Sequence, residues 1–193
     1  MRRTLTAVTL AVCLGTSAIV TSTCRPRLPA AESRLAREIL LFWRDLGRKL
    51  VEMAEDFPED RYAYRPTPNV RQFSEILRHV AEENFVYLQT ARGEPVNRDS
   101  SSQRGSPRAE MAGFLKDSFE QGAAVIADTS DEEMLEQVTT PYGKRLTRLA
   151  FWLELVQHAA EHYGNLVTYY RLNGLIPPET RRTRQPSNSQ PAR

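Results

Sequence analysis

The sequence WLELVQHAAEHYGNLVTYY, residues 152–170, combines apolar side chains around most of a helical circumference with two of the chain's three histidines. The helix that contains it is expected to run from near Thr147 to Leu172. Only four of its positions form a clear polar strip: Glu154, Gln157, Glu161 and Thr168. A helix with so wide an apolar arc belongs at the centre of a fold. His158 and His162 are spaced i and i+4, so they lie one turn apart on one face and can chelate one divalent ion.

Three further amphipathic helices are expected, each with apolar residues recurring every three or four positions. The first begins near Leu35 and ends before Pro58. The second runs from about Gln72 to Ala91 and carries the third histidine, His79, at the edge of its apolar face. The third follows Ser106-Pro107, which has the pattern of an N-cap and a first-turn proline. Four long helices joined by loops predict an all-α fold, a four-helix bundle.

The connections between these helices are short or polar. Residues 130–137 have capping-box spacing and predict a short helix, whereas residues 139–144, with a proline and a glycine, predict a loop. No run of strand-like alternation is present in the sequence. Residues 181–193 have no apolar face and are expected to be disordered. The predicted organisation is therefore a leader at 1–30, a bundle at 31–179 and a disordered tail at 180–193.

The first thirty residues have the pattern of a bacterial export signal. Arg2 and Arg3 precede an uncharged apolar run, and small residues at 21–23 offer a cleavage zone. Export to the periplasm or another extracytoplasmic space is therefore expected, with a mature start between about Cys24 and Glu32 that N-terminal sequencing can identify. An uncleaved membrane anchor and lipidation of Cys24 remain alternatives. Cys13 and Cys24 are the only cysteines, so cleavage after this segment would leave no disulfide and no thiol ligand.

The length and charge of the chain limit the number of domains and the kind of partner that we expect. A chain of 193 residues favours one domain with a real hydrophobic core. The net charge of +2 conceals an uneven distribution, because eight of the 26 basic residues lie in 1–30 and 181–193, whereas all 24 acidic residues lie in 31–180. The body of the protein is therefore net acidic. Such a body has no obvious surface for tracking phosphates, which argues against a nucleic-acid partner.

Two interpretations of the histidines follow from the sequence. Together His79, His158 and His162 could hold a divalent metal facially and leave positions open for water or substrate, as in catalytic sites. Alternatively, they are ordinary histidines with satisfied hydrogen bonds, since one i,i+4 pair can arise by chance. Four neighbouring side chains could orient the imidazole rings: Glu82, Glu83, Gln157 and Glu161. The tyrosines and both tryptophans, Trp43 and Trp152, are expected to be mainly core residues.

Four short motifs, in this order and at this separation, resemble the DinB/YfiT-like superfamily. They are YRPTP at 64–68, FSEILRHV at 73–80, HxxxHYGNL at 158–166 and YRLNGLIPP at 170–178. The resemblance covers about residues 34–179. It implies a four-helix bundle with a three-histidine site for zinc, nickel or iron. On that pattern His79 matches the ligand of the second helix, and His158 and His162 match the paired ligands of the last helix.

The resemblance also implies chemistry. Relatives include transferases and isomerases that depend on low-molecular-weight thiols. This chain departs from them at Tyr163-Gly164-Asn165, where relatives often carry a basic residue and a glutamine, and in its export signal. We therefore expect a metal-dependent hydrolase or transferase of a small molecule, with the catalytic residues unassigned. The alternative is a non-catalytic bundle that binds a metal, a ligand or a protein partner, and a homodimer is left open.

Overall fold

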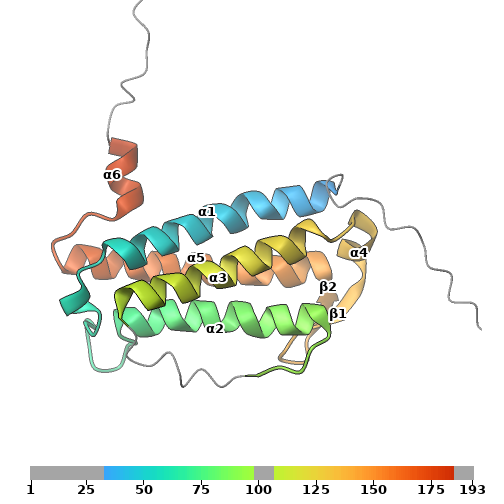
Figure 1. Ribbon diagram of the computed structural model, residues 1–193, viewed down its shortest axis with the longest axis horizontal. Coiled ribbons are helices and arrows are strands. Elements are labelled where there is room, and N and C mark those ends of the chain that lie inside the picture. Colours follow the sequence, from blue (N-terminus) through green and yellow to red (C-terminus); the bar gives the residue numbers. More distant parts are fainter. Residues whose placement is uncertain (1–32, 98–106, 185–193) are drawn as a thin grey trace, which may run out of the picture.

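A computed structural model describes residues 33–97 and 107–184. Four long helices dominate it, which confirms the predicted all-α four-helix bundle (Figure 1). The elements in chain order are α1 Arg34–Asp56, the 3-10 turn η2 Glu59–Arg61, α2 Phe73–Arg92, α3 Arg108–Ala127, α4 Asp131–Leu135, β1 Gln137–Thr139, β2 Arg145–Thr147, α5 Arg148–Leu172 and α6 Pro178–Arg184. The predicted leader at 1–30 lies outside the described residues. Within the described ranges, no helix is both long and apolar enough to cross a membrane.

The four long helices form a closed ring of neighbours. Helix α3 packs on α1 and α2, and α5 packs on the same two helices from the other side of the bundle, behind them in Figure 1. The pairs α1–α2 and α3–α5 are therefore diagonal. This order makes α2 and α5 adjacent along their lengths, so side chains from the two helices can meet.

Local signals fix where the two helices of the α2–α5 pair begin. The Gln72 side chain accepts a hydrogen bond from the backbone of Glu75, and the Glu75 carboxylate accepts one from the Gln72 N–H at 2.7 Å, which is a capping box. The Thr147 hydroxyl accepts from the Ala150 N–H at 3.2 Å at the start of α5. These caps satisfy backbone donors that a helix N-terminus otherwise leaves unpaired. They set the residue at which each helix begins and therefore the position of its histidines along the bundle axis.

Helix α5 contributes large aromatic side chains to the core, but it is not the central helix that its wide apolar arc predicted, because it packs on two long helices as α3 does and Leu153 of that arc is exposed. Trp152, Phe151 and Tyr170 are buried on α5, and Trp152 contacts Trp43 of α1 edge to face, with ring centroids 5.9 Å apart. The Tyr170 hydroxyl donates to the Met53 carbonyl at 2.9 Å, which satisfies its buried polar end. Burying large aromatic side chains from α1 and α5 holds the bundle together independently of any ligand.

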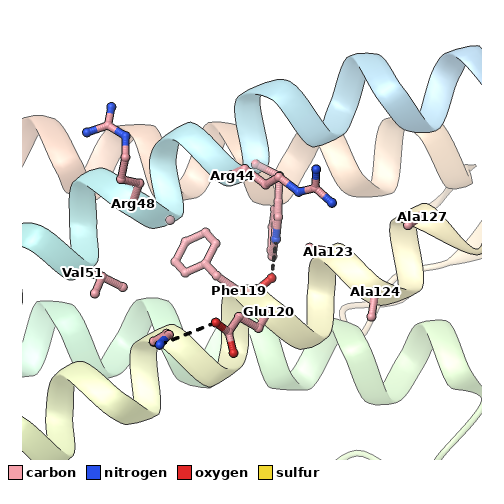
Figure 2. Close-up of a pocket in the computed structure, with 11 residues that line it drawn as sticks. Arg44, Arg48, Val51, Phe119, Glu120, Ala123, Ala124 and Ala127 are labelled. Atoms are coloured by element: carbon pink, nitrogen blue, oxygen red, sulfur yellow. Dashed lines mark hydrogen bonds and ion pairs between the residues drawn. The ribbon is translucent and has the colours of Figure 1, made fainter.

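Helices α1 and α3 approach closely because a glycine on each accepts a ring from the other. A β-carbon at Gly47 would lie 2.8 Å from the Phe119 ring, and one at Gly122 would overlap the Trp43 ring. The Trp43 Nε1 donates to the Phe119 carbonyl at 2.8 Å, a bond that is visible in Figure 2. The two glycines therefore set the spacing of this pair of helices.

The predicted loop at 139–144 forms the turn of a short hairpin, with only Thr139 of that range in a strand. Strands β1 and β2 pair antiparallel, with Val138 opposite Leu146, and the preceding helix α4 ends at Leu135 rather than Gln137. The Thr140 hydroxyl accepts from the backbone N–H groups of Tyr142 and Lys144 within the turn. Gly143 supplies the positive φ of 81° that the turn requires. Strands of three residues are too short to show an alternating pattern in the sequence.

The C-terminal segment also differs from its prediction. Residues 180–184, assigned to the disordered tail, belong to helix α6, and residues 185–193 lie outside the described part of the chain. Arg181 pairs with Asp56, and Arg182 pairs with Glu52. Without an apolar face, α6 had no periodic signal, and it is held to α1 by charge.

Truncation after Pro177 is expected to lower the free energy of unfolding by only about 1 kcal/mol, because exposed ion pairs contribute little. Equilibrium urea denaturation of the full and truncated chains measures the change. A chain truncated after Arg184, which keeps α6, serves as the control and should have the same free energy of unfolding as the full chain. A loss of several kcal/mol for the Pro177 truncation would contradict the view that α6 is only a peripheral element.

Candidate metal centre

The structure brings the three histidines together across the α2–α5 interface. His79 comes from α2, and His158 and His162 come from consecutive turns of α5. The Nε2 atom of His158 lies 3.1 Å from the Nε2 of His79 and 3.1 Å from the Nε2 of His162. All three ligand atoms lie within 4.8 Å of one another. Each side chain is partly buried, so the cluster lies at the wall of the bundle and not in its core.

Hydrogen bonding alone does not explain this convergence. A neutral imidazole Nε2 carries either one hydrogen or one in-plane lone pair, so His158 cannot make a full hydrogen bond to both neighbours through that atom. The ring planes are nearly perpendicular to one another, at 79°, 84° and 90°. Two nitrogens bound to one zinc ion at about 2.0–2.1 Å lie roughly 3.0–3.4 Å apart. The three imidazoles therefore fit a single divalent ion.

The surroundings keep the three imidazoles neutral, which is the form that binds a metal. Burial, followed by the positive charge of Arg71 and the nearby His162 imidazole, lowers the pKa of His79 to about 4. Burial, with His158 and Arg71, lowers the pKa of His162 to about 4. The pKa of His158 is also lowered, mainly by burial and then by His79. The donor set is thus ready for a cation at neutral pH.

The metal-free protein should lose stability as the pH falls from about 6.5 to about 4. In the unfolded chain the histidines take up protons near pH 6.5, whereas in the folded protein His79 and His162 do so near pH 4. Between these values the unfolded state binds more protons, so acidification favours unfolding. Urea midpoints after chelation should therefore fall more steeply in the wild type than in a variant with asparagine at 79, 158 and 162. Equal falls would contradict the buried neutral state.

The side chains expected to orient the rings do not bind the two histidines of α5. The Nδ1 atoms of His158 and His162 are buried and have no hydrogen-bond partner within the described residues. Glu161 accepts instead from the Gln157 amide at 2.9 Å, and Glu82 pairs with Arg78 at 3.1 Å. Glu83 accepts from the Tyr142 hydroxyl at 2.6 Å. Packing of the two helices, not hydrogen bonding at Nδ1, holds the two α5 rings in place.

A cavity of about 540 Å³ adjoins the cluster, with His79 and His158 in its wall. The hairpin turn closes one side of it: the Lys144 ammonium lies 3.0 Å from the Glu154 carboxylate, which also accepts from the Tyr87 hydroxyl at 3.0 Å. Sequence reasoning missed these two contacts because they join different elements of the fold. Tyr87, Tyr62 and Tyr170 are buried core residues, as expected, and of these three Tyr87 also lines the cavity.

A second concavity, of about 550 Å³, lies between α1 and α3 (Figure 2). Trp43, Val51 and Phe119 give it an apolar floor, and Arg44, Arg48 and Lys116 reach its rim. No histidine lines it, and it shares no residue with the cavity beside the cluster. This groove therefore has no role in the candidate metal centre.

Comparisons with known proteins bear on the whole bundle. The family model of the DinB superfamily matches residues 43–166. The uncharacterized protein YjoA of Bacillus subtilis strain 168 is 21% identical over 125 residues, which span 64% of this chain and 80% of YjoA. A crystal structure of a DinB-like protein from Bacillus cereus ATCC 10987 superposes with a TM-score of 0.63 at 14% identity, over 74% of this chain and 95% of that one. The crystal structure of YjoA gives a TM-score of 0.57, over 71% and 92% of the two chains. These structures share the fold.

Proposed function

The chain belongs to the DinB superfamily, and from that premise we propose that it is an exported, metal-dependent hydrolase or transferase that acts on a small molecule. His79, His158 and His162 would hold one divalent ion. The observation that carries this proposal is the convergence of three neutral imidazole nitrogens at the wall of a cavity. Three protein ligands leave coordination positions open, which is the arrangement of catalytic and not of structural metal sites.

The side chains of this chain have separable roles in the proposal. The three imidazoles bind the ion in neutral form, and α2–α5 packing fixes their directions. A divalent ion bound there would polarise a substrate or lower the pKa of a bound water or thiol. Tyr87 and Glu154 line the cavity from α2 and α5, and the turn residues Tyr142 and Lys144 line it from the hairpin. At about 540 Å³ the cavity has room for a small molecule.

A second candidate function is non-catalytic binding of a metal or a small ligand. The unpartnered Nδ1 atoms of His158 and His162 favour it. In catalytic metal sites the second ring nitrogen of a ligating histidine almost always donates to an acceptor, which tunes the ligand. A site without such acceptors can still bind a metal.

Elemental analysis of the mature protein, purified without a histidine tag, tests the proposal. One zinc, nickel or iron ion per chain is the expected result, and imidazole ligands suit each of these metals, as well as copper. Activity that is lost on chelation and restored by the same metal would then favour the enzyme over the binding protein. A metal-free protein that also fails to take up any of these ions would contradict the enzyme and the metal-binding form of the second candidate, and would leave only binding of a small ligand.

A further inference from the structure

The cavity beside the histidines has an acidic wall. Its lining includes three carboxylates and one ammonium: Glu83, Glu154, Glu161 and Lys144. The ammonium of Lys144 pairs with Glu154, so these two charges offset each other. The lining side chains thus carry a formal surplus of two negative charges at neutral pH, because a histidine that ligates a metal is neutral.

Glu161 carries the charge that is least offset. It accepts a hydrogen bond from the neutral amide of Gln157, at 2.9 Å. Among the residues that the structure describes, no lysine or arginine forms an ion pair with it. Its position on α5, between His158 and His162, keeps its charge next to the cluster on an exposed face of the helix. A cationic group in the cavity would therefore find an available acceptor there.

An acidic wall alone is an ordinary solvated surface, but this one adjoins the metal centre. His79 and His158 line the same cavity, so a molecule bound to the ion from this side lies within the acidic wall. A divalent ion would offset the surplus of two negative charges. A group of the bound molecule that ligates the ion in its anionic form then adds one negative charge. An ammonium on the same molecule would offset that charge.

We propose that the cavity selects a small molecule that carries a protonated amine beside the group that binds the metal, an inference that rests on the proposed metal site. Glu161 accepts hydrogen bonds from the ammonium, and charge-assisted bonds of this kind are the stronger ones. Because the Lys144 ammonium is already paired with Glu154, it attracts an anionic group of the bound molecule less strongly than an unpaired ammonium would. A negatively charged second group on the molecule would meet a net repulsion from the wall.

Three small thiols serve as probes on the full mature protein loaded with one equivalent of cobalt(II): cysteamine, 2-mercaptoethanol and mercaptoacetate. Their second groups are an ammonium, a neutral hydroxyl and a carboxylate. Binding is followed by the change in the cobalt absorption spectrum. The measured quantity is the ratio of the dissociation constants of mercaptoethanol and cysteamine, compared between variants, because differences between the thiol groups themselves cancel in that comparison.

The ratio is expected to fall about threefold or more in Glu161→Gln, a range set by partly exposed charge pairs. It should rise in Lys144→Met, which frees Glu154. Relative binding of mercaptoacetate should change in the opposite direction in each variant. Glu120→Gln on α3, at the groove of Figure 2, removes the same charge away from the site and should leave the ratio unchanged.

These measurements distinguish a failure of the proposed metal site from a failure of the proposed amine selectivity. A protein that does not bind cobalt at the histidines overturns the metal site and this inference together. A protein that binds cobalt and thiols, but with the same ratio in the wild type and in Glu161→Gln, overturns the amine selectivity alone. An equal fall in the ratio of dissociation constants for Glu120→Gln would also overturn the amine selectivity, because the effect would then come from the net charge of the protein.

Discussion

Replacing His158 with alanine is expected to abolish stoichiometric metal binding while leaving the helical circular dichroism largely intact. His158 is the centre of the cluster, since its Nε2 lies 3.1 Å from the Nε2 of both other histidines. Loss of an outer-shell partner of a metal ligand typically lowers affinity about 10–100-fold, so loss of a ligand itself should exceed that range. Elemental analysis and a competitive chelator titration measure the effect.

The fold should survive this substitution because aromatic packing, not the metal, joins the helices. The large side chains next to the cluster in sequence, such as Leu155, are buried in the core, whereas His158 is only partly buried. Asn165→Ala, an exposed position on the same helix, is the matched control and should retain the metal. The wild type, but not His158→Ala, should gain thermal stability on addition of metal, because a ligand that binds only the folded state stabilises it by mass action.

Two results would contradict the assignment. Equimolar metal in His158→Ala with wild-type affinity would place the ion elsewhere. Collapse of the helical signal in His158→Ala, together with an unchanged Asn165→Ala, would show that the imidazole is a structural element of the bundle. In that case His79→Gln, which keeps a polar side chain at the α2 position, would test the ligand role separately.

The sequence predicts the part of the candidate site that helical geometry determines. The i,i+4 spacing of His158 and His162 fixes their separation once α5 forms. His79 follows because Ile76, Leu77 and Val80 are buried, which leaves the histidine at the edge of the α2 face that meets α5. The resemblance to a known family supplied the pairing of the two helices, which spacing alone does not determine.

The parts that the sequence did not reveal depend on tertiary contacts. The cavity wall joins Tyr142 and Lys144 of the hairpin to Glu83 and Glu154 of two helices, and no local pattern links these positions. The hairpin itself has only three residues in each strand. Helix α6 lacks an apolar face, and the charges of α1 that hold it are distant in sequence. Composition could show that these residues are polar, but not what they contact.

Gly122→Ala on α3 should destabilise the protein, although alanine is the better helix former. Alanine in place of glycine inside a helix normally gains about 0.5–1 kcal/mol. At Gly122, however, the added β-carbon would overlap the Trp43 ring. Trp43 cannot swing aside readily, because its Nε1 donates to the Phe119 carbonyl and its ring packs on Trp152. Overpacking of a well-filled core typically costs about 1–3 kcal/mol, so the clash should outweigh the gain.

Gly113→Ala on the same helix provides the matched control. Nothing lies within 4 Å of a β-carbon at Gly113, so this substitution gains helix propensity without a clash and should stabilise the protein. The propensity gain is common to both variants, so they should differ by the cost of the clash, about 1–3 kcal/mol in the free energy of unfolding measured by urea denaturation. Metal content should remain unchanged in both, because α2 and α5, not α1 and α3, carry the histidines. Equal stability of the two variants would mean that α1 and α3 separate at little cost, and the close approach at Gly122 would not determine the spacing of the bundle.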